Sequence, residues 1–103
     1  MNKIKVGLYL VNKGYQGVDL SNPEAGNPGI GGTQYNFITF PYYYMKFFDD
    51  IEFVFYAQII DTLPTKFKAI QVTDVSNAAE KAKSDECDIF IYRPTEDKEG
   101  FDF

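Results

Sequence analysis

The sequence contains no histidine, only one cysteine, Cys87, and only one arginine, Arg93. Without histidine the chain cannot use an imidazole as a general base or as a metal ligand. A lone cysteine cannot form a disulfide within the chain, which is typical of proteins from a reducing compartment. No spacing of acidic residues or cysteine suggests a metal site, so no metal and no cofactor is predicted.

Positive charge is also scarce, since the chain carries a net charge of -5 and its lysines are scattered. Nucleic acids and anionic membrane surfaces require clustered Lys and Arg, so neither is predicted as a partner. No apolar run approaches the ~20 residues of a membrane span. The apolar run at the N-terminus is too short for a signal peptide, so a cytoplasmic location is expected.

Aromatic residues, in contrast, are abundant: ten Phe and eight Tyr make up 17% of the 103 residues. This is enough apolar volume for the core of one domain, predicted to span residues 1–103. Apolar and small-residue patterns predict strands at Ile4–Val11, Glu52–Tyr56, Ala69–Thr73 and Asp88–Tyr92, and helices at Thr33–Phe48, Ala57–Leu63 and Asn77–Lys83.

This alternation of strands and helices predicts an α/β fold. We expect a three-layer, Rossmann-like domain, with a mostly parallel sheet of about four strands in the order 3-2-1-4 and helices on both faces. The second and third strands are separated by about twelve residues, near the minimum for a parallel crossover, so a hairpin is an alternative there. Pro41 lies inside the first helix and is expected to kink or split it.

The most informative segment is the loop between the first strand and the first helix, Asn22 to Tyr35, which is rich in glycine. A strand, a glycine loop and a helix in succession aim backbone N–H groups and a helix N-terminus at an anion. The spacing is not the dinucleotide fingerprint, because a third glycine would be needed where Gln34 stands. A nicotinamide or flavin site is therefore not expected.

The run Gly-Ile-Gly-Gly-Thr-Gln-Tyr at 29–35, after a strand and before a helix, resembles the N-terminal domain of GT-B-fold glycosyltransferases. The resemblance covers about the first half of the chain. It is greatest to retaining enzymes of the group 1, or family 4, type that build bacterial surface polysaccharides. It implies that Gly31, Gly32, Thr33 and Gln34 lie beside the diphosphate of a nucleotide-sugar donor. The long loop from Asn12 to Ile30 and Pro41 depart from the family pattern.

The resemblance also implies partners that the chain itself lacks. The donor would be shared with a missing C-terminal domain, and the sugar would go to a glycan or lipid-linked acceptor. The chain is then expected to be the N-terminal part of a longer two-domain enzyme, with no catalytic residue of its own and no activity alone. The alternative is a non-catalytic, flavodoxin-like module that binds phosphate or a partner protein.

Several other residues bear on binding, on the start of the first helix, or on association of the chain with itself. Lys13, just past the first strand, and Arg93, at the end of the fourth, could contact an anion, although a solvated lysine and an arginine paired with the acidic tail are the simpler interpretations. Thr33 is the expected N-cap of the first helix. The aromatic run at residues 40–48 is expected to pack mainly in the core with one exposed edge. An open fourth strand and exposed aromatic rings, among them Tyr42 to Tyr44 and Phe47 or Phe48, together predict a homodimer.

Overall fold

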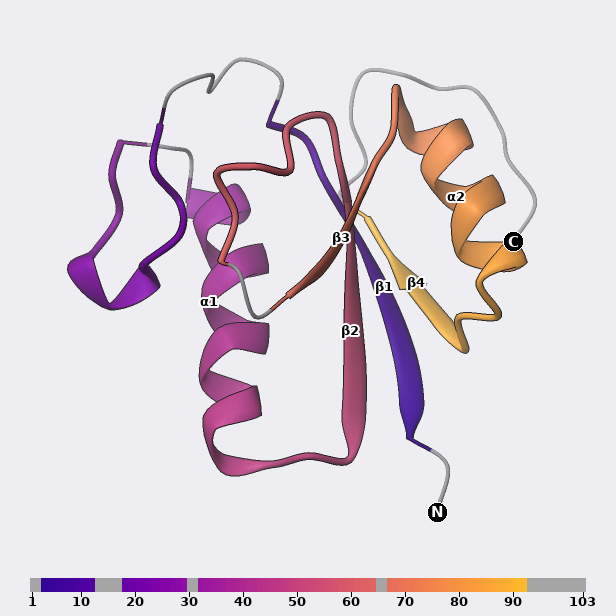
Figure 1. Ribbon diagram of the computed structural model, residues 1–103, viewed down its shortest axis with the longest axis horizontal. Coiled ribbons are helices and arrows are strands. Elements are labelled where there is room, and N and C mark those ends of the chain that lie inside the picture. Colours follow the sequence, from indigo (N-terminus) through magenta and orange to yellow (C-terminus); the bar gives the residue numbers. More distant parts are fainter. Residues whose placement is uncertain (1–2, 13–17, 30–31, 65–66, 93–103) are drawn as a thin grey trace.

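The computed structural model describes residues 3–12, 18–29, 32–64 and 67–92, with the backbone alone for residues 32–34. Its centre is a parallel sheet with the strand order β3-β2-β1-β4, which confirms the predicted class and order (Figure 1). The hairpin alternative is wrong, because β2 and β3 run parallel. The elements are β1 (Ile4–Leu10), η1 (Pro23–Ala25), α1 (Gly32–Phe47), β2 (Ile51–Ala57), β3 (Lys68–Gln71), α2 (Val75–Ser84) and β4 (Ile89–Ile91).

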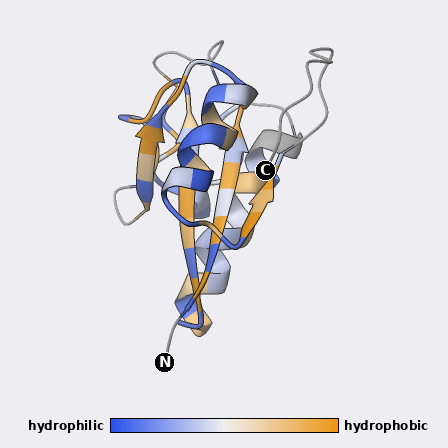
Figure 2. Ribbon diagram, turned by 90° about the vertical axis from the view of Figure 1, so that its right-hand side faces the viewer, coloured by the Kyte–Doolittle hydropathy of each residue, from blue (hydrophilic) through white to orange (hydrophobic). Residues whose placement is uncertain are grey.

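The two central strands, β1 and β2, are buried on both faces along most of their length, and for that reason they are apolar at nearly every position (Figure 2). Alternate side chains of a strand point to opposite faces. One face of β1 and β2 packs with residues of α1, in a cluster that includes Leu8, Phe55 and Ile38. The other face packs with α2, in a cluster that includes Tyr56 and Ala78. The three predicted layers are therefore present.

Helix α1 is continuous from Gly32 to Phe47 although it contains Pro41. Of the two expected outcomes, a kink or a split, the split is wrong, because the helix continues past the proline. Pro41 is fully buried, on the side of the helix that faces the core. Most of the stability of a helix in a protein comes from packing of its apolar face, and here that packing offsets the backbone hydrogen bond that proline cannot make.

The helix predicted over Ala57–Leu63 is absent: β2 continues through Ala57, and the residues after it form a bend and a turn. Backbone groups that would form hydrogen bonds within such a helix are instead bonded to residues far away in the sequence. Both the N–H and the carbonyl of Ile59 bond to the side chain of Asn12. The carbonyl of Thr62 accepts a hydrogen bond from the backbone of Leu20. Tertiary partners thus override a local helical pattern.

Helix α2 confirms the predicted helix, but it begins two residues earlier, at Val75, and ends one residue later, at Ser84. Asp74 is its N-cap and accepts a hydrogen bond of 2.8 Å from the backbone N–H of Asn77. The three alanines of this helix, Ala78, Ala79 and Ala82, are buried. The small side chains let the helix lie close to the sheet.

The Tyr56 side chain crosses from β2 to the far end of α2. Its hydroxyl donates to a carboxylate oxygen of Asp85 at 2.8 Å and lies 3.5 Å from the sulfur of Cys87. Its ring passes over Gly7 of β1, which has no Cβ to obstruct it. Burial, together with the contacts to Cys87 and Asp85, raises the pKa of the Tyr56 phenol well above its ordinary value of 10.0.

We therefore expect Tyr56 to make the folded protein less stable at alkaline pH. Below pH 10 the phenol is neutral in both states and its stabilising contribution is fully present. Above pH 10.0 the unfolded chain loses this proton while the folded chain keeps it, so the free energy of unfolding falls as pH rises. Urea unfolding between about pH 8 and pH 11 should show a shallower decline for Tyr56→Phe than for the wild type. Equal slopes for the two proteins would contradict this prediction.

Candidate functional site

The candidate site is the edge of the sheet at which all four strands end, seen at the top of Figure 1. Both α1 and α2 begin at this edge. The chain leaves β1 toward α1 on one face, and it reaches β4, the other neighbour of β1, through α2 on the opposite face. Such a reversal of strand order leaves a crevice between diverging connections, which is where open α/β sheets bind ligands.

The two helix N-termini at this edge differ in their charge. The first turn of α2 is capped by the carboxylate of Asp74, which already occupies a position where an anion would bind. The first turn of α1 contains no acidic residue and begins at Gly32. Free backbone N–H groups and the helix dipole both favour a negative charge at such an end. Of the two, α1 is therefore the end suited to an external anion.

The predicted donor-site residues fall on this end of α1 as far as the structure describes them. Gly32, Thr33 and Gln34 are the first three residues of the helix. Thr33 is thus inside the first turn, and the expectation that it is the N-cap is wrong, since the helix begins one residue before it. Gly31, Lys13 and Arg93 lie outside the described residues.

Asn12 holds this edge of the sheet together, immediately beyond β1. Its side chain is 1% exposed. The amide nitrogen donates to the carbonyl of Ile59 at 2.7 Å, and the amide oxygen accepts from the N–H of Ile59 at 3.0 Å. The Asn12 side chain thereby makes the pair of hydrogen bonds that a neighbouring strand would make, and it connects the loop after β1 to the loop after β2.

Gln58 extends this network across three strands. Its side-chain oxygen accepts from the backbone N–H of Asn12 at 3.0 Å, and its nitrogen donates to the hydroxyl of Tyr9 at 2.7 Å and toward the carbonyl of Thr73 at 3.5 Å. Sequence reasoning named Asn12 only as the start of the long loop and missed Gln58 and Tyr9. The positions of the two amides in the sequence could have indicated this role, because Asn12 and Gln58 each follow the end of one of two adjacent parallel strands.

The loop between β1 and α1 is attached to the side of the helix. Glu24 of η1 accepts from the ammonium group of Lys46 at 2.6 Å and from the hydroxyl of Tyr42 at 2.9 Å. These contacts raise the pKa of both Lys46 and Tyr42. The hydroxyl of Tyr35 donates to the carbonyl of Pro23 at 3.0 Å. Glu24 therefore serves as an anchor for the loop.

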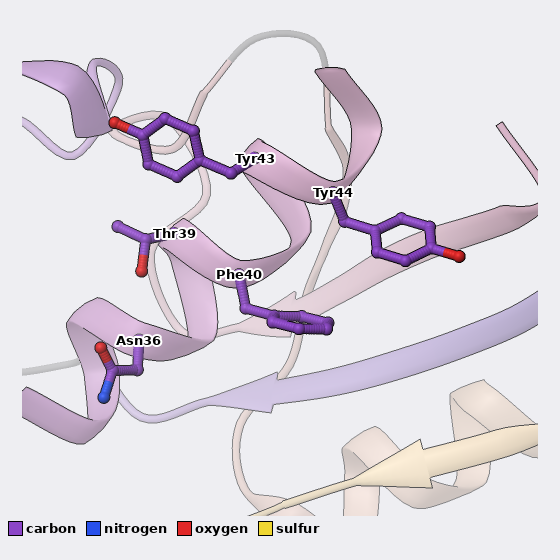
Figure 3. A pocket seen from close by; sticks show the side chains of 5 residues that line it. All are labelled: Asn36, Thr39, Phe40, Tyr43 and Tyr44. Atoms are coloured by element: carbon purple, nitrogen blue, oxygen red, sulfur yellow. The ribbon is translucent and has the colours of Figure 1, made fainter. Parts of the chain in front are cut away.

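A hollow of about 630 Å³ lies on the outer side of α1 (Figure 3). It is shallow, and aromatic rings form much of its lining. The hollow lies along the surface of α1 and begins at Asn36, two residues beyond Gln34 of the candidate anion site. The lining residues are Asn36, Thr39, Phe40, Tyr43 and Tyr44.

Comparisons of the chain with protein families, with curated proteins and with solved structures give no match. Within the part of the chain that the structure describes, no helix has the length and apolar character needed to cross a membrane. Three features still bear on function: the fold, the geometry of the carboxyl edge, and the resemblance of the glycine loop to that of GT-B-fold glycosyltransferases.

Proposed function

We propose that this chain is the N-terminal, Rossmann-like part of a GT-B-type glycosyltransferase and that the start of α1 contacts the donor diphosphate. The observation that carries the proposal is the first turn of α1: it follows β1 at the switch point of the sheet and has no acidic residue. The glycine loop that precedes it allows a phosphate to approach the backbone closely.

The expected affinity is low. The helix dipole contributes only about 0.3–1 kcal/mol toward an anion at an exposed helix end. In the family that the loop resembles, most contacts to the base and ribose come from the C-terminal domain. We therefore expect a dissociation constant of ~1 mM or weaker for a nucleoside diphosphate, equivalent to roughly 4 kcal/mol, and no sugar transfer by this chain alone.

Titration of UDP or GDP into isotope-labelled protein, followed by NMR, tests the anion site. Chemical-shift changes are expected at residues 29–36 and should saturate at tens of millimolar ligand. Gln34→Glu places a carboxylate in the first turn and should weaken binding at least about fivefold. Ser84→Glu adds the same charge at the exposed C-terminal end of α2, away from the carboxyl edge of the sheet, and should leave binding within about twofold.

Changes elsewhere, or none, would contradict the diphosphate site. Equal effects of the two charge substitutions would show that only the net charge matters. In either case the alternative function, a module that binds a partner protein, would be favoured, because α1 exposes large aromatic side chains.

A further inference from the structure

The outer face of α1 carries a continuous aromatic stripe. Asn36, Phe40, Tyr43 and Phe47 are spaced by four, three and four residues, which places them along one side of a helix. Phe40 is 65% exposed, Phe47 75% and Tyr43 40%, and Phe48, just beyond the helix, is 58% exposed. Monomeric proteins rarely expose so many neighbouring large apolar side chains.

Two of the exposed rings, those of Phe40 and Phe48, are held in place by Tyr44, which connects them to the core. The ring centre of Tyr44 lies 6.0 Å from that of Phe40 and 4.8 Å from that of Phe48. It also lies 5.8 Å from that of Phe53, a buried residue of β2. The Tyr44 hydroxyl donates to Asp50 at 2.6 Å. A surface fixed in this way loses little side-chain entropy when it is covered.

We infer that the occupant of this face is a second copy of the chain, bound with the two α1 helices antiparallel about a two-fold axis. A two-fold interface is formed by the same patch on both copies, so the patch must complement itself. When Phe40 lies opposite Tyr43 of the second copy, Phe47 lies opposite Asn36. Each Phe47 then enters the hollow on the other copy beside Asn36 and Phe40 (Figure 3).

The available area suits a weak, specific dimer. If a whole aromatic residue presents about 200 Å², the exposed parts of the four aromatic residues amount to roughly 500 Å² per copy. Two copies then bury about 1,000 Å², and polar neighbours at the rim bring the total near 1,200 Å², the low end for specific interfaces. The expected dissociation constant is about 10–100 µM.

The charges around the stripe favour the antiparallel arrangement. Asp49 and Asp50 directly follow the C-terminal end of α1, and no acidic residue lies in its first turn. Antiparallel helices bring these carboxylates beside the positive N-terminal end of the other α1. Parallel helices would place four carboxylates together. The cation on the helix, Lys46, already pairs with Glu24 and is not needed for the contact.

The alternative dimer would join two β4 strands, each at the edge of the sheet in the part of the chain that the structure describes. β4 is a short edge strand of three residues and also exposes Ile89 and Ile91. A three-residue edge provides few backbone hydrogen bonds for a partner, whereas the stripe on α1 runs over about three turns. The antiparallel arrangement of the α1 helices places Asp49 and Asp50 of one copy at the α1 N-terminus proposed for the diphosphate, so dimerisation and diphosphate binding should compete. The dimer itself is measured without any ligand.

Sedimentation velocity at about 10 µM to 1 mM protein tests the inference across the expected dissociation constant. The wild type should shift from monomer to dimer in this range. Phe40→Glu and Phe47→Glu should each weaken association at least about tenfold. Ile89→Glu, a matched change at an exposed apolar residue of β4, should behave like the wild type. All three positions are exposed, and circular dichroism of each variant confirms that it is folded.

Asp49→Lys tests the orientation of the helices. It should weaken the dimer at about 50 mM salt, and the difference from the wild type should shrink at about 1 M salt, where charges are screened over ~3 Å. A wild type that remains monomeric at about 1 mM, or a dimer abolished by Ile89→Glu but not by Phe47→Glu, would overturn the inference. Stronger association of Asp49→Lys would overturn the antiparallel arrangement.

Discussion

Replacement of Asn12 by leucine is expected to lower the free energy of unfolding by about 2–5 kcal/mol. The leucine side chain fills a similar volume but cannot bond to the N–H and the carbonyl of Ile59. Both backbone groups face a side chain that is 1% exposed, so water cannot replace the lost partners easily. Each buried polar group left without a partner costs about 1–3 kcal/mol. Because small domains have only about 5–15 kcal/mol of stability, much of it would be lost.

Urea unfolding followed by circular dichroism measures this cost, and Asn77→Ala is the matched control. Asn77 also uses its side-chain oxygen to accept a backbone N–H, that of Thr73 at 3.0 Å, but in an exposed bond. That loss should be at most about 1 kcal/mol. If Asn12→Leu does not fold, Asn12→Ser supplies an intermediate case with a shorter polar group. An Asn12→Leu variant as stable as Asn77→Ala would refute the role assigned to Asn12.

Substitution of Gly7 by alanine is the second change with a large expected effect, a loss of about 1–3 kcal/mol. A Cβ at this position would lie 3.0 Å from the Cε2 atom of Tyr56 and 3.2 Å from the sulfur of Cys87. Both neighbours are packed between the sheet and α2 and have little freedom to move. In a strand interior alanine is otherwise more favourable than glycine. A loss of stability in Gly7→Ala can therefore be attributed to the steric clash of the added Cβ.

A double-mutant cycle with Cys87→Ala identifies the clash. Removing the sulfur should recover part of the loss in Gly7→Ala, with a coupling of at least about 0.5 kcal/mol. Gly29→Ala is the control: its φ of 109° disfavours alanine, but nothing lies within 4 Å of the added Cβ. Its cost should not depend on Cys87. Additive effects of Gly7→Ala and Cys87→Ala would show that the expected contact does not limit packing.

Most of the fold could be predicted from the sequence, because the signals for its strands and helices are local and repeated. The apolar run from Ile4 and the run from Glu52 each predict a strand buried on both faces, and the alanines after Asp74 predict a helix against the sheet. The right-handed crossover rule then leaves few strand orders, and the observed order is among them. The parallel pairing of β3 required the structure, since its short connection also permits a hairpin.

The features that sequence reasoning missed depend on contacts between distant residues. Asn12 and Ile59 are 47 positions apart, and Gln58 and Tyr9 are 49 apart. No periodicity in the sequence reveals such pairs. Nothing in the sequence therefore indicated that hydrogen bonds to distant residues would replace the helix predicted over Ala57–Leu63. Pro41 is a similar case, because its burial against the core is a property of the fold rather than of the neighbouring residues. The anion site at α1 stays a prediction from the loop and the sheet edge.

The central position of β1 has a consequence for the order of events as the chain is made. β1 is the first strand in the sequence, yet its partners are β2 and β4, and the bond from the Lys5 N–H to Asp88 joins residues 83 positions apart. Pairings that close such long loops are slow to form. During synthesis the apolar residues of β1 must remain unpaired until β2 emerges from the ribosome, and the sheet is complete only once β4 has followed. Of the four strands of this sheet, the first to be made is thus among the last to be fully enclosed, and its apolar residues are exposed to non-native contacts during that interval.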